Sequence, residues 1–82
     1  PDLCGWRRER IALPPDATYV DVAPDWICEV ISPSTEKRDR TIKRRIYAEI
    51  GVAHLWFLEP RFQTLEVFSL DGGRWVLEGT WN

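Results

Sequence analysis

The sequence predicts a mixed α/β domain in which a central sheet is flanked by a helix and completed by a C-terminal β-hairpin. Three features predict it: a compact apolar run over residues 26–31, an uninterrupted helical pattern over 36–50, and two strand-like segments separated by a Gly-Gly turn. A helix between two strands usually connects parallel neighbours. We therefore expect the order strand, strand, helix, strand, hairpin, with a parallel pair around the helix.

Length and composition limit the classes of protein that the chain can belong to. Its 82 residues are 44% hydrophobic and predict one folded domain over 1–82, with a loop at 13–16. No apolar run approaches the roughly 20 residues of a membrane span, and no signal-peptide pattern is present, so we expect a cytoplasmic protein. The chain begins at Pro1 and contains no Met. We therefore expect part of the fold to precede it.

The apolar run Trp26–Ile31 is predicted to be a central strand covered on both faces, and a further short strand is expected over 3–7. Glu29 is the one charge in the apolar run. A buried carboxylate costs several kcal/mol unless it is paired or bound to a metal. Glu29 therefore requires a partner.

Residues 36–50 are predicted to form a helix that Thr35 caps and Gly51 ends in the left-handed conformation. At about 100° per residue, Asp39 and Lys43 fall within the apolar stripe and should face the sheet. They pair with each other, or they form an ionisable cluster with Glu29 of the kind found in active sites. The expected apolar stripe consists of Ile42, Ile46, Ile50 and Tyr47, and the residues expected outside it are Lys37, Arg44 and Arg45.

The C-terminal third predicts a strand over 54–59 and a hairpin in which 64–70 pairs with 75–79 across Asp71-Gly72-Gly73. The exposed edge of this hairpin, together with a small core, makes a homodimer an expected assembly. The five tryptophans are expected to be mostly core residues. Strand parity makes a Cys4–Cys28 disulfide improbable.

The pattern of acidic residues and one polar block resemble a known nuclease family. Pro1-Asp2 followed by Glu29 is similar to the PD-(D/E)xK nuclease signature. The longer pattern resembles a large bacterial family of restriction-endonuclease-like proteins, catalogued as a domain of unknown function and abundant in cyanobacteria. The residues that carry this resemblance are Pro24-Asp25-Trp26-Ile27-Cys28-Glu29-Val30-Ile31-Ser32-Pro33-Ser34-Thr35, then Asp39, Lys43, Tyr47, Gly51-Val52 and Leu55-Trp56.

The resemblance implies a restriction-endonuclease-like sheet whose first helix and strand are absent from this chain, and it implies a metal site. Asp2 and Glu29 would be ligands of Mg²⁺ or Mn²⁺, with the Val30 carbonyl as a third ligand. Ile31 stands where the motif has its lysine, and Lys43 is the replacement. Its pKa, lowered by burial, would let it deprotonate or orient water, or else it would neutralise charge on the phosphate.

Two functions remain open at this stage. One is a Mg²⁺-dependent endonuclease that acts on DNA, with Asp2, Glu29 and Lys43 as catalytic residues. The other is a noncatalytic remnant that keeps the fold as a binding or scaffold module. The net charge of −2 argues against strong non-specific electrostatic binding to DNA. However, nine of the eleven Lys and Arg residues lie in two runs. These runs are solvated faces or contacts with the phosphate backbone.

Overall fold

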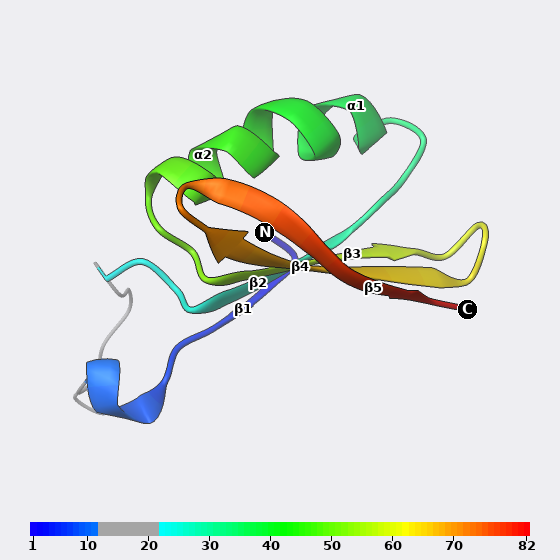
Figure 1. The fold of residues 1–82 in the computed structure, drawn as a ribbon. Helices are drawn as coiled ribbons and strands as arrows, with labels where there is room; N and C mark the ends of the chain where they lie inside the picture. The colour runs from blue at the N-terminus through cyan, green and yellow to red at the C-terminus, as the bar shows by residue number, and fades with distance from the viewer. Residues whose placement is uncertain (12–21) are drawn as a thin grey trace, which may run out of the picture.

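The computed structural model describes residues 1–11 and 22–82, and the loop expected at 13–16 lies outside them. Five strands and one interrupted helix make up most of this part (Figure 1). In chain order the elements are β1 (Leu3–Gly5), the 3-10 turn η1 (Arg8–Arg10), β2 (Trp26–Val30), α1 (Glu36–Arg38), η2 (Asp39–Lys43), α2 (Arg44–Glu49), β3 (His54–Glu59), β4 (Thr64–Asp71) and β5 (Arg74–Trp81).

The strands form one sheet in the order β1-β2-β3-β4-β5. The pair β2 and β3, which the helix connects, is parallel, and the other three pairs are antiparallel. The predicted mixed α+β architecture, the parallel crossover and the C-terminal hairpin are therefore confirmed. Gly72 and Gly73 form the hairpin turn with φ values of 58° and 80°, the left-handed region that a two-residue turn of this kind requires. None of the helices in the described ranges is long and apolar enough to cross a membrane.

Residues 36–49 form one continuous helix whose middle segment, η2, is π-helical. The Thr41 hydroxyl donates to the carbonyl of Lys37 at 2.5 Å, which accounts for the disturbed backbone ladder there. At the C-terminal end, Gly51 has a φ of 81°, and Val52 N–H donates to Tyr47 O, as predicted for a glycine-terminated helix. The expected Thr35 cap is wrong in detail, because its hydroxyl contacts Ser32 and makes no capping hydrogen bond.

The helix covers one face of the sheet (Figure 1). Asp39, Lys43 and Tyr47 face the sheet as predicted, but the isoleucines of the expected stripe do not. Asp39 and Tyr47 are buried, whereas the expected stripe residues Ile42, Ile46 and Ile50 are 57%, 46% and 50% exposed. The core beneath the helix consists of Ile27, Ile31, Tyr47, Val52, Leu55, Phe57 and Phe68.

Arginine packing explains this correction. The Arg40 guanidinium lies over the Phe57 ring at 5.1 Å, and that of Arg44 lies over Phe68 at 4.7 Å. Arg44 was expected on the outer side of the helix. Guanidinium groups stack on aromatic faces while their alkyl stems cover apolar surface, so the helix turns its cationic row toward the sheet. A stripe defined by apolar side chains alone therefore gives the wrong orientation.

The opposite face of the sheet has no helix over it in the part of the chain that the structure describes (Figure 1). Trp26 and Trp56 meet there edge to face at 5.2 Å, and Val30 is 37% exposed. The expectation that β2 is covered on both faces is met on the helix side and only in part on the other, where Cys28 is buried but Val30 is exposed. Four of the five tryptophans are partly buried and Trp81 is 55% exposed, so the expectation that they are mostly core residues is wrong.

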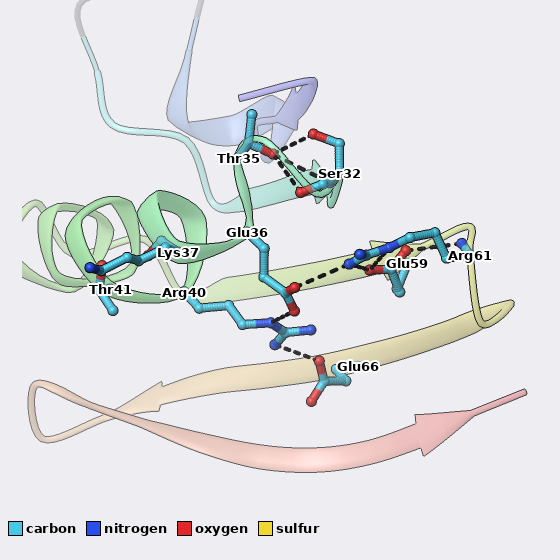
Figure 2. A network of polar contacts seen from close by, with 9 residues as sticks. All are labelled: Ser32, Thr35, Glu36, Lys37, Arg40, Thr41, Glu59, Arg61 and Glu66. Carbon is cyan, nitrogen blue, oxygen red and sulfur yellow. Dashed lines mark hydrogen bonds and ion pairs between the residues drawn. The ribbon is translucent and has the colours of Figure 1, made fainter.

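A polar network joins the start of the helix to β3 and β4 (Figure 2). Glu59, at the end of β3, is 3% exposed and accepts hydrogen bonds from the backbone and guanidinium of Arg61. Arg61 also contacts Glu36 at 3.1 Å, and Arg40 bridges Glu36 at 3.1 Å and Glu66 at 2.7 Å. The network therefore connects the helix to the turn between β3 and β4.

This network should make the stability depend on pH. The Arg61 side chain is the largest cause that holds the pKa of Glu59 below its ordinary value of 4.5. A group whose pKa is lowered by folding contributes stability above its unfolded pKa, and the contribution disappears as the pH falls through the folded value. We expect Glu59→Gln to lower Tm at pH 7, and the difference from the wild type to shrink toward pH 3.

Thermal unfolding monitored by circular dichroism between pH 7 and pH 3 measures this effect. Glu49→Gln is the matched control, because Glu49 is exposed and makes no ion pair within the described residues. Its Tm should follow that of the wild type. Coincident curves for Glu59→Gln and the wild type would show that the Glu59 carboxylate adds nothing to stability, and a constant offset between them would show that its contribution does not depend on ionisation.

Candidate active site

Strand pairing places Asp2 opposite Glu29. Leu3 pairs with Cys28 in the antiparallel ladder of β1 and β2, so the residue before Leu3 lies across from the residue after Cys28. Residues directly opposite each other project to the same face of a sheet. The Asp2 carboxylate is fixed further by Val30, whose backbone N–H donates to Oδ2 at 2.7 Å. Both acids therefore stand at one end of β2, on the helix-covered face.

Glu29 is 1% exposed and has partners on both carboxylate oxygens. The Tyr47 hydroxyl donates to Oε1, and Lys43 Nζ lies 3.6 Å from Oε2. A buried carboxylate needs such partners, because its desolvation costs several kcal/mol. The helix thus supplies the partners that the sequence showed Glu29 to need.

Lys43 lies between two carboxylates, since its Nζ is also 3.0 Å from Asp39 Oδ1. The Asp39 carboxylate is the largest cause that raises the pKa of Lys43 above its ordinary value, and partial burial opposes it. Glu29 adds to the upward shift. The expectation that burial lowers the pKa of Lys43 is therefore wrong, because two adjacent anions outweigh desolvation. At neutral pH Lys43 is an ammonium ion.

These side chains surround a cleft of about 390 Å³ between the helix and the β1 edge of the sheet. Ser32 and Thr35 also line it, and their hydroxyls hydrogen-bond to each other at 2.9 Å. The full lining consists of Pro1, Asp2, Glu29, Val30, Ser32, Thr35, Asp39 and Lys43.

The oxygen ligands in the cleft are chemically suited to a hard cation, although the protein provides few of them. Asp2, Glu29 and the Val30 carbonyl are oxygen donors, which Mg²⁺ prefers, and Mg²⁺ usually keeps several of its waters. Residues 1–11 and 22–82 contain no group of three or more His, Cys, Asp or Glu side chains placed to hold a metal. An ion here would have a coordination shell completed by water or substrate phosphate.

Packing explains why position 31 carries isoleucine rather than the lysine of the motif. Ile31 is 2% exposed, belongs to the core cluster, and donates its backbone N–H to Leu58 O at 2.7 Å. A lysine there would bury its charge among apolar side chains. Lys43 reaches Glu29 from the helix, so the cationic group is present although the strand does not carry it.

Sequence reasoning missed the role of the Tyr47 hydroxyl, because Tyr47 was assigned to the apolar stripe. Burial in the core is the largest cause that raises its pKa, followed by the bond to Glu29, so the phenol stays protonated and donates. The available signal was the spacing of Asp39, Lys43 and Tyr47, four residues apart, which places all three along one side of a helix.

The remaining candidates lie away from the cleft. Cys4 is exposed and Cys28 is buried, and neither forms a disulfide, as strand parity predicted. Burial is the largest cause that raises the pKa of the Cys28 thiol. His54 begins β3, as expected for the strand predicted over 54–59, and is exposed, outside the lining of the cleft.

Comparison with known proteins identifies the family of the chain. No curated protein matches the chain significantly. The family model described as "Uma2: Putative restriction endonuclease" matches residues 1–81, which is nearly the whole chain. It includes Asp2, Glu29 and Lys43, the groups that the fold brings together. The chain belongs to the Uma2 family of putative restriction endonucleases.

Proposed function

We propose that this domain hydrolyses phosphodiester bonds of DNA with Mg²⁺ as its cofactor. One observation carries the proposal: Lys43 Nζ lies 3.6 Å from Glu29 Oε2, in the same cleft as Asp2. Two acids and a lysine are the groups of a PD-(D/E)xK site. Here the lysine comes from the helix rather than from the strand that carries Glu29.

Each group has a distinct role in this proposal. Asp2, Glu29 and the Val30 carbonyl hold the ion, which when bound would polarise the phosphate and acidify a water. Lys43 carries a full positive charge beside the cleft and stabilises negative charge that develops on the phosphate oxygens. It also orients the attacking water by hydrogen bonding. Its raised pKa makes it unsuited to act as a general base at neutral pH.

Basic residues on the outer side of the helix favour a polyanion as the substrate. Lys37, Arg38 and Arg45 are exposed and make no ion pair within the described residues. Cations of this kind contact the phosphate backbone without reading its sequence. The local charge thus compensates for a net charge of −2.

Metal binding should depend on Glu29. We expect Mn²⁺ or Mg²⁺ to bind weakly, because the protein provides few ligands, and Glu29→Gln to remove most of the binding because the amide lacks the negative charge. Calorimetric titration of the full chain measures it. Glu49→Gln, which changes an exposed helix acid, should bind like the wild type. Equal heats for the wild type and Glu29→Gln would mean that Glu29 is structural only.

Hydrolysis should depend on Lys43. We expect Lys43→Met to lower kcat about 10²–10³-fold, the usual effect of removing one group that stabilises transition-state charge. The assay is cleavage of plasmid DNA by the full chain with Mg²⁺. Arg45→Met is the control, since Arg45 is an exposed cation on the same helix and should change only DNA affinity and its salt dependence.

The same assay tests the noncatalytic alternative. A folded wild type that binds neither Mn²⁺ nor Mg²⁺ and cleaves no DNA would identify the domain as a scaffold or binding module. Equal activities of Lys43→Met and Arg45→Met would show instead that Lys43 has no special role.

A further inference from the structure

Tyr47 makes a buried polar contact in the site, yet the proposed reaction does not use it. Its side chain is 7% exposed and belongs to the core cluster, where it lies with Ile27 and Leu55. Its hydroxyl donates to Glu29 Oε1. A buried phenol needs a hydrogen-bond partner, and this one is a carboxylate that lines the cleft.

The contact restricts the orientation of the Glu29 carboxylate, because its two oxygens have different partners. Oε1 accepts from Tyr47, and Oε2 faces Lys43 Nζ at 3.6 Å. The terminal torsion of a glutamate is otherwise broad. With Oε1 bound to the helix, Oε2 is the oxygen that remains directed to the ammonium.

One side of a single helix holds the whole arrangement. Asp39, Lys43 and Tyr47 follow each other at four-residue intervals, and Lys43 Nζ is 3.0 Å from Asp39 Oδ1. Asp39 thus holds the lysine from one side, and Tyr47 holds its glutamate from the other. Groups fixed on a regular element are positioned more tightly than groups on loops.

We propose that Tyr47 is a positioning residue, whose hydroxyl fixes the Glu29 carboxylate so that Oε2 faces Lys43 and the cleft. This inference rests on the proposed function and extends it to a group that touches neither metal nor substrate. Partners that orient metal-ligating side chains typically account for 10–100-fold in metal affinity or activity.

The test is Tyr47→Phe in the full chain, which removes one oxygen and keeps the ring in the core. Mn²⁺ affinity, measured by calorimetry, should fall about 10–100-fold. In DNA cleavage, kcat should fall while KM for DNA stays unchanged, since the outer helix surface is intact. A third readout needs no metal: the ¹H–¹⁵N resonance of the Lys43 ammonium should broaden as Glu29 gains rotational freedom.

Two further variants separate positioning from a general loosening of the fold. Trp75→Phe removes a partly buried indole N–H that donates to Arg44 O of the same helix at 2.9 Å, and it should leave Mn²⁺ affinity unchanged. The double variant Tyr47→Phe/Glu29→Gln should bind Mn²⁺ no more weakly than Glu29→Gln alone, because Tyr47 acts through Glu29.

The outcomes distinguish this proposal from the proposed function. A wild type that neither binds Mn²⁺ nor cleaves DNA contradicts the nuclease function, and the Lys43 resonance then decides the positioning role. An unchanged Lys43 resonance in Tyr47→Phe overturns that role. With an active wild type, unchanged Mn²⁺ affinity and kcat in Tyr47→Phe also overturn it, as does an equal loss of affinity in Trp75→Phe.

Discussion

The structure depends on a carboxylate buried near the end of an apolar strand. Glu29 is 1% exposed, and removing a carboxylate from water costs several kcal/mol unless other groups compensate. The helix supplies two compensating partners, the Tyr47 hydroxyl and the Lys43 ammonium. The need to satisfy one strand residue thus constrains which side of the helix faces the sheet. The same contacts produce a cleft lined by acids and a lysine, so the requirement for stability and the candidate chemistry have one origin.

The helix satisfies this constraint by packing charged and aromatic groups against the sheet. Arg40 and Arg44 lie over the rings of Phe57 and Phe68, where their stems cover apolar surface. Ile42, Ile46 and Ile50 remain about half exposed on the surface of the helix. The π-helical segment lies between Asp39 and Lys43, and such interruptions occur frequently at functional sites. The helix therefore functions as the second wall of the cleft as well as a cover for the core.

A separate ion network fixes the helix at its other end. Glu36 and Arg40 connect it to Arg61 after β3 and to Glu66 on β4, around the buried Glu59 (Figure 2). Charged groups in a network of this kind have fixed geometry, unlike isolated surface pairs. The helix is thus held to the sheet by polar contacts at two places, with Glu29 at the cleft and Glu59 near the turn between β3 and β4. Arg40 and Arg44 add contacts with the rings of Phe57 and Phe68.

Local residue types determined the strands, the Gly-Gly turn, the glycine that ends the helix, and the parallel crossover, because each depends on neighbours in the chain. They also identified Glu29 as a charge in need of a partner. The resemblance of the sequence to a nuclease motif likewise followed from residue types alone. The orientation of the helix depended on tertiary structure, since apolar periodicity takes no account of guanidinium groups stacked on Phe57 and Phe68. The pKa of Lys43 likewise depended on which groups surround it. Burial predicts a lower value, but Asp39 and Glu29 raise it, because a charge interacts most strongly with the ions nearest to it in space.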